Sequence, residues 1–143
     1  MLLTPLITII VLALCVLIHY ELLVSLTSKV SRFEFSHRSA IVLGAIRAMV
    51  SHIIQVWVYA LGYWLLLELG EGYGSIKGEP ITEFIDWVYF SFVVYSTLGF
   101  GDMVPTGWVR FMVGTESIMG LVMIAWTASF LFLELQKQWR SKG

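Results

Sequence analysis

The segment Ser96-Thr97-Leu98-Gly99-Phe100-Gly101-Asp102 contains the residues whose types and spacing could perform chemistry. Its two glycines are separated by one residue and can adopt positive φ without a Cβ clash. A short extended strand here could therefore direct successive carbonyl oxygens to the same side. Four copies around an axis would stack rings of carbonyl oxygens from Thr97, Leu98, Gly99 and Phe100, with the Thr97 hydroxyls at the inner end. Such rings can replace the water shell of a desolvated monovalent cation.

The same segment resembles the signature filter of potassium channels, T-V-G-Y-G-D, with Leu98 for the Val and Phe100 for the Tyr. The resemblance implies that Thr97 to Gly101 form a selectivity filter in a homotetramer. Potassium would be the permeant ion there, bound at Thr97, Leu98, Gly99 and Phe100, and no cofactor is implied. It also implies a short helix just before the segment and a spanning helix on either side.

Length and composition place the chain in a lipid bilayer. A chain of 143 residues with a mean hydropathy of +0.83 is one unit that is too apolar for an ordinary soluble domain. The net charge of −1 implies no nucleic-acid partner, and Cys15 lies alone in an apolar run as a small buried hydrophobe. No metal-ligand cluster, nucleophile-base pair or phosphate loop appears, so an enzyme with a small-molecule substrate is not expected.

Three apolar segments are long enough to cross about 30 Å of hydrocarbon. They are residues 1–26, 39–69 and 108–134. A cleaved signal peptide is the alternative for the first, which lacks the basic n-region of such peptides. We predict an N-terminal transmembrane helix 1–26, a loop 27–38, a pore domain 39–134 and a tail 135–143.

Residues 83–95 form the short helix that the resemblance requires, with Thr82 as a plausible N-cap. At about 20 Å, this helix is too short to span the bilayer. It would dip in and lead into the filter at 96–102, a geometry permitted only where the backbone is buried in protein or lines water. The predicted fold is therefore an all-α membrane protein with three transmembrane helices, a re-entrant pore helix and a filter, assembled as a homotetramer.

Charge predicts the orientation in the cell membrane. Six of the nine Lys and Arg lie in the loop 27–38 or in the tail 135–143, which places both in the cytoplasm. The N-terminus and the filter would then be outside. The outer loops carry an excess of acidic residues, which would concentrate cations at a pore mouth.

Residues outside the ion-binding positions are expected to support the filter, beside Ser96 at its start, and the resemblance implies two of them. Trp87 and Tyr89 are the pore-helix aromatics that brace it, and Tyr89 is the candidate hydrogen-bond partner of Asp102. Glu116 should lie beside the pore helix, with a structural hydrogen bond to pore-helix or filter backbone, or with tuning of conductance as the alternative.

The last apolar segment contains the candidate gate. Gly120 matches the family's inner-helix hinge, although close helix packing explains a glycine there about as well. Ile124, Ala128 and Phe132 recur every fourth residue and share a face that could line a cavity. Phe132 is the candidate for a hydrophobic constriction that closes by dewetting.

Charged and polar residues in the other spanning segments are candidates for coupling. Arg47 and Glu21 could form a structural ion pair, reach separately to the headgroups, or act as a gate latch. His52 and Gln55 share a helical face with Tyr59, which indicates an interhelical hydrogen-bond cluster, with a proton sensor as the alternative. The three histidines are expected at different depths, so no metal site is predicted.

Together these patterns predict a potassium-selective channel that conducts passively. A weakly selective cation channel is the alternative within the class, because Leu98 and Phe100 alter the packing around the carbonyl rings. A non-conducting membrane scaffold or accessory subunit with an inactive filter is the alternative from another class.

Overall fold

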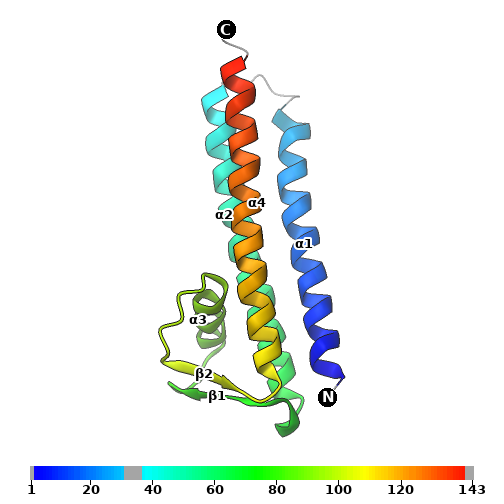
Figure 1. The fold of residues 1–143 in the computed structure, drawn as a ribbon, viewed down its shortest axis with the longest axis vertical. Helices are drawn as coiled ribbons and strands as arrows, with labels where there is room; N and C mark the ends of the chain where they lie inside the picture. Colours follow the sequence, from blue (N-terminus) through cyan, green and yellow to red (C-terminus); the bar gives the residue numbers. More distant parts are fainter. Residues whose placement is uncertain (1, 31–36, 141–143) are drawn as a thin grey trace.

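The computed structural model describes residues 2–30 and 37–140, and it is almost entirely helical (Figure 1). Its elements are α1 (Leu3–Val30), α2 (His37–Glu68), the short 3-10 turn η1 (Glu71–Tyr73), β1 (Ser75–Gly78), α3 (Phe84–Tyr95), β2 (Met103–Thr106) and α4 (Val109–Arg140). The predicted all-α membrane architecture is confirmed.

Three helices are long and apolar enough to cross a bilayer, over Leu3–Val24, Ile41–Glu68 and Val109–Gln136. α1 and α4 run in one direction and α2 runs in the other (Figure 1). Large apolar side chains remain exposed along each of them, for example Leu17, Ile46 and Leu121. A helix that is apolar on its outer face as well as its inner face is typical of a membrane span.

The long helices extend beyond the predicted boundaries. α1 continues to Val30 where a loop was predicted from residue 27, α2 begins at His37 rather than at residue 39, and α4 continues to Arg140 rather than to residue 134. Hydropathy marks where a helix leaves the hydrocarbon, whereas Lys, Arg and Gln beyond that point are good helix formers. The rest of the predicted loop and tail, residues 31–36 and 141–143, lies outside the described residues.

A two-stranded antiparallel sheet holds both ends of the re-entrant segment together. β1 precedes α3 and β2 follows residue 102, and their register pairs Ser75 with Thr106 and Gly78 with Met103. This sheet was not predicted, because the sequence indicated a loop over 70–82 and a turn around Pro105. Proline is tolerated here because both strands are edge strands.

Gly78 is required for this pairing. Its φ is 114°, and a Cβ there would lie 1.9 Å from the carbonyl oxygen of Asp102. The amide of Glu79 donates to that same carbonyl at 3.0 Å. The chain before α3 is thus fixed directly against the last residue of the predicted filter.

α3 begins one residue later than predicted, and its N-cap is Glu83 rather than Thr82. Asp86 in the first turn accepts hydrogen bonds at Oδ2 from the backbone amides of Thr82, at 2.7 Å, and Glu83, at 2.9 Å. Those two amides lower the pKa of the Asp86 carboxyl. The start of the re-entrant helix is therefore stabilised by a carboxylate near its positive end.

Packing around α2 forms the core. Tyr59 and Tyr63 of α2, Phe90 of α3 and Met112 of α4 are all buried, with the Tyr63 and Phe90 rings edge to face and their centroids 5.1 Å apart. α1 packs against this unit through Val11 and Cys15, and the thiol is fully buried as predicted.

Candidate ion-conduction site

The backbone of residues 96–102, the filter segment, alternates in handedness. Thr97, Gly99 and Gly101 have φ of 57°, 56° and 81°, whereas no positive φ occurs at Leu98 or Phe100. Such alternation allows successive carbonyl groups to lie on one side, unlike a β-strand, in which they alternate. Thr97 adopts this conformation despite its Cβ, at a cost of about 1–2 kcal/mol, so the surrounding structure must hold it there.

Amide groups of the filter segment are anchored on the C-terminus of α3. Thr97 donates to the Val94 carbonyl at 3.0 Å, and Leu98 and Gly99 both donate to the Val93 carbonyl, at 3.0 and 3.4 Å. Among the described residues, no hydrogen bond ends on the carbonyl oxygens of Thr97 to Phe100. The first half of the segment therefore satisfies its amide donors on α3, whereas the carbonyls of Thr97 to Phe100 accept no hydrogen bond among the described residues.

Ser96 belongs to the end of α3 rather than to the extended part. Its amide donates to the Phe92 carbonyl at 3.0 Å and its hydroxyl donates to the same carbonyl at 2.7 Å. These bonds satisfy a carbonyl of the last helical turn, which would otherwise have no partner. Ser96 thus fixes the point at which the helix stops and the filter segment starts.

The hydrogen bond expected between Tyr89 and Asp102 is present. The Tyr89 hydroxyl donates to Oδ2 of Asp102 at 2.5 Å, and this bond raises the pKa of Tyr89. It connects the middle of α3 to the far end of the filter segment. Trp87, the other expected aromatic, is half-buried beside a depression of about 610 Å³ between the end of α2, β1 and the start of α3.

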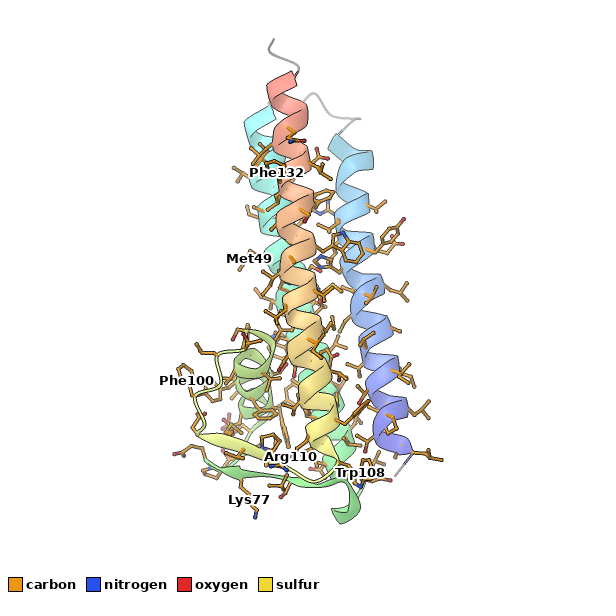
Figure 2. All side chains as sticks on the ribbon, viewed as in Figure 1. Met49, Lys77, Phe100, Trp108, Arg110 and Phe132 are labelled. Atoms are coloured by element: carbon orange, nitrogen blue, oxygen red, sulfur yellow. The ribbon has the colours of Figure 1, made fainter. Side chains whose placement is uncertain are left out.

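The side chains of the filter segment are exposed in the single chain. Leu98 is 58% and Phe100 64% exposed, and Figure 2 shows Phe100 at the outer edge of the segment. Behind the segment lies a mostly apolar hollow of about 380 Å³, in which Thr97 and Gly99 face Val113 and Ser117 of α4. One chain alone leaves this region open.

Glu116 is fully buried between α2, α3 and α4. It accepts hydrogen bonds from the hydroxyls of Tyr63 and Ser91, the latter at 2.5 Å. Its position beside the pore helix is as expected, but its partners are side-chain hydroxyls rather than backbone. The Ser91 hydroxyl also lies 2.9 Å from the Val56 carbonyl, so this cluster ties α4 to both other helices.

The candidate gate residues occupy two kinds of position on α4. Gly120 packs directly on α3, where a Cβ would lie 2.1 Å from the Tyr95 carbonyl oxygen, so close packing accounts for this glycine. Ile124, Ala128 and Phe132 are exposed. Figure 2 shows Phe132 near the end of α4 that is opposite to Phe100.

The candidate coupling pair is not brought together. Arg47 is half-buried on α2, whereas Glu21 is exposed on α1 and, within the described part of the chain, forms no ion pair with it. Helical spacing gave the depth of each residue but not the face on which each side chain lies, which is why the sequence suggested a pair.

His52 takes part in a larger cluster than predicted. Its ring nitrogens contact Tyr95 and Thr127, and its ring centroid lies 5.2 Å from that of His19. The expectation that the histidines lie at different depths is wrong for this pair, because α1 and α2 are antiparallel and bring residues 33 positions apart to one level. The hydroxyl of Tyr59, which was expected in this cluster, has no hydrogen-bond partner among the described residues.

A family model described as ion channel matches residues 49–137, which is more than half of the chain. The chain belongs to this ion-channel family. It is accordingly a multi-pass membrane protein with an ion-channel domain, and membership of a family of transport proteins agrees with the expectation of a non-enzyme. Comparison with curated proteins and with solved structures gave no match.

The family match covers three of the four α-helices and leaves out α1. It contains most of α2, all of α3, the filter segment and nearly all of α4, whereas α1 lies outside it. The ion-channel domain alone therefore accounts for the filter segment and Glu116, but not for the contacts that α1 makes.

Proposed function

We propose that four copies of this chain assemble around one axis to form a potassium-selective channel. The carbonyls of Thr97 to Phe100 and the Thr97 hydroxyl would bind K⁺ in place of its water shell. The observation that carries the proposal is the alternating φ of Thr97, Gly99 and Gly101 inside the region that matches the ion-channel family. Free carbonyl acceptors along the same stretch support it further.

Exposure of the filter segment supports assembly. Irregular backbone at membrane depth is tolerated only where protein covers it or where it lines water. In one chain the segment has Leu98 and Phe100 exposed on one side and the apolar hollow on the other. Neighbouring copies would cover both, and the exposed α4 face with Ile124, Ala128 and Phe132 would line the cavity, with Phe132 as its constriction.

Charge and topology support a filter that faces the outside of the cell membrane. The N-terminal end of α1 lies at the same end of the molecule as the two strands, and the C-terminal end of α4 lies at the opposite end (Figure 1). Around the strands and the start of α3, Glu79, Glu83, Asp86 and Asp102 outnumber Lys77. Such an acidic mouth would concentrate cations, and the negative end of α3 adjoins the filter segment.

The test is ion flux through the purified protein in liposomes. We expect K⁺ flux down its gradient and a reversal potential that follows the K⁺ gradient rather than the Na⁺ gradient. Native mass measurement in nanodiscs should give four copies. Equal permeability to Na⁺ and K⁺ would replace the proposal with a weakly selective cation channel. Absence of any flux from a folded tetramer would overturn it in favour of an accessory subunit.

A further inference from the structure

Five buried or half-buried polar side chains, one or more from each α-helix, contact one another in a closed circuit. They are His19 of α1, His52 and Gln55 of α2, Tyr95 of α3 and Thr127 of α4. Four of them lie within the spanning segments, and Tyr95 ends the re-entrant helix. Burial of so many polar groups is favourable only if their donors and acceptors match.

Counting hydrogens fixes the direction of the first contacts. Oε1 of Gln55 can only accept, so the Tyr95 hydroxyl donates to it at 3.0 Å. A hydroxyl has a single hydrogen, so the Tyr95 oxygen must accept in its contact of 2.8 Å with Nδ1 of His52. His52 therefore carries its hydrogen on Nδ1.

The remaining hydrogen-bond directions follow in the same way, through Thr127 of α4 to His19 of α1. Neutral His52 accepts at Nε2 from the Thr127 hydroxyl, 3.0 Å away. The Thr127 oxygen then accepts from Nε2 of His19, at 3.3 Å. His19 is thus the opposite tautomer, and its Nδ1 accepts from the Gln55 amide at 3.1 Å, which closes the circuit. The Ser51 hydroxyl lies 3.0 Å from the same nitrogen, so Ser51 borders the circuit at this point. The second amide hydrogen of Gln55 goes to Ser51, at 3.0 Å.

We propose that His19, His52, Gln55, Tyr95 and Thr127 form a one-directional hydrogen-bond ring that positions the start of the filter segment. In this ring His19 is a positioning residue, through which α1 helps to hold the start of the filter segment. The effect on conduction rests on the proposed channel function, whereas the ring itself does not.

Tyr95 transmits the position of the ring to the filter segment. Its hydroxyl is held by Gln55 and His52, and its backbone is held by the close approach of Gly120. The next residues in the chain are Ser96, which ends α3, and Thr97, the first residue with positive φ. A rigid aromatic side chain fixed at both ends leaves the last turn of α3 little freedom.

An added proton must open the ring. Each member of the ring donates one hydrogen to the next member and accepts one from the previous member. A protonated imidazole carries a hydrogen on both nitrogens. Its newly protonated nitrogen would then face the donor from which it had accepted a hydrogen bond. Among the described residues, the titratable groups in contact with the histidines are the other imidazole and the Tyr95 hydroxyl of α3. The Cys15 thiol of α1 lies 3.9 Å from the Gln55 carbonyl, and Arg47 lies one turn from Ser51 on α2. With the His19 and His52 centroids 5.2 Å apart, two positive charges would also repel.

Substitution of Thr127, which joins the two histidines, tests the role in conduction. Thr127→Val keeps the shape and removes the hydroxyl, so K⁺ flux in liposomes at pH 7.5 should fall severalfold and the preference for K⁺ over Na⁺ should decrease. The acid response of the wild type between pH 8 and 3.5 should disappear in this variant. Thr127→Ser keeps the hydroxyl and should restore the wild-type pH profile. Thr8→Val is the matched control, because the Thr8 hydroxyl donates only to the Thr4 carbonyl of its own helix.

An unchanged pH profile in Thr127→Val, or a wild type with no acid response, would overturn this positioning role. Nitrogen NMR of labelled histidine in nanodiscs tests the ring without conduction. We expect an Nε2–H tautomer for His19 and an Nδ1–H tautomer for His52 at pH 7.5, each changed by Thr127→Val and unchanged by Thr8→Val. Identical tautomers, or a charged imidazole at that pH, would overturn the ring. Correct tautomers in a protein that passes no K⁺ would instead overturn only the proposed channel function.

Discussion

The filter segment and the five-residue ring lie next to each other, but they are built from different parts of the chain. The filter segment presents backbone carbonyls, is exposed, and includes Thr97 in a left-handed conformation. The ring presents side chains, is buried or half-buried, and has every donor matched to an acceptor. The conformation of the filter segment depends on glycines that can adopt positive φ, whereas the ring depends on the identity of each side chain.

This difference has an energetic side. Residues with positive φ store strain that only the surrounding structure can hold, and here the anchors are the α3 carbonyls and the Tyr89 bond to Asp102. A complete ring inside the protein has no unmatched group and so provides a rigid support. The strained backbone of the filter segment lies next to a ring whose hydrogen bonds are all matched. We infer that the ring fixes the position of the filter backbone.

Gly99→Ala should produce the largest effect, because it disturbs the alternating backbone conformation of the filter segment. Within one chain a Cβ at Gly99 meets nothing within 4 Å, so the penalty there comes from the φ of 56° and is about 1–2 kcal/mol. We expect K⁺ flux in liposomes to be lost with helicity unchanged. Gly114→Ala, also in open space but on helical backbone, should conduct like the wild type. Normal flux in Gly99→Ala would show that the alternation is not needed.

Gly120→Ala should have the next largest effect, because it acts where the two regions meet. The added Cβ would lie 2.1 Å from the Tyr95 carbonyl oxygen, so α3 and α4 must move apart. Overpacking of this kind costs about 1–3 kcal/mol, which should lower the thermal unfolding midpoint in detergent. Gly114→Ala on the same helix is again the control, and an equal midpoint for both variants would exclude the close contact.

Tyr89→Phe should have a moderate effect on the filter side alone. It removes the hydrogen bond to Asp102 and should lower the ratio of K⁺ to Na⁺ permeability, while the histidine tautomers of the ring stay unchanged. In the wild type the raised pKa of Tyr89 keeps the hydroxyl protonated, so this contribution is present below its ordinary pKa of 10.0 and is lost only as pH rises through the raised value. Permeability ratios measured in both proteins from pH 7 to 10 check this, and parallel loss in both would contradict it.

Asp86→Asn should have the smallest effect, because it is remote from both regions. The amides of Glu83 and Thr82 lower the pKa of Asp86, so its stabilisation of α3 is present above the ordinary value of 3.8 and is lost as pH falls through the lowered one. We expect a slightly lower unfolding midpoint at pH 7 and no difference from the wild type at very low pH. Glu79→Gln, which leaves Asp86 and its two amide donors in place, should not change the midpoint at pH 7.

Local patterns predicted most of the fold. Apolar runs of sufficient length gave the three spanning helices, and a run too short to span gave α3. The strands were missed because four residues with Gly and Pro carry no strand pattern, and they form only because the chain ends on either side of α3 meet. Helix ends were misplaced because charge predicts the membrane boundary rather than the end of helical structure.

The two parts of the candidate site differ in how far the sequence could predict them. Gly99 and Gly101 are separated by a single residue in the sequence, and the hydrogen bond of Tyr89 to Asp102 was expected from a resemblance. The ring is assembled from residues up to 108 positions apart, such as His19 and Thr127. The sequence showed that His52 and Gln55 share one face of a helix, but their partners from α1, α3 and α4 depend on how the helices pack.

The pairing of Gly78 with Met103 closes the stretch between them into a loop within each subunit. The entropy lost in closing a loop is then a cost of folding the monomer, not of association. In the proposed tetramer, subunits that meet with this loop already closed would have fewer residues to order on binding, which would favour tight assembly. The small sheet would let each chain of that tetramer shape its part of the pore mouth before the subunits associate.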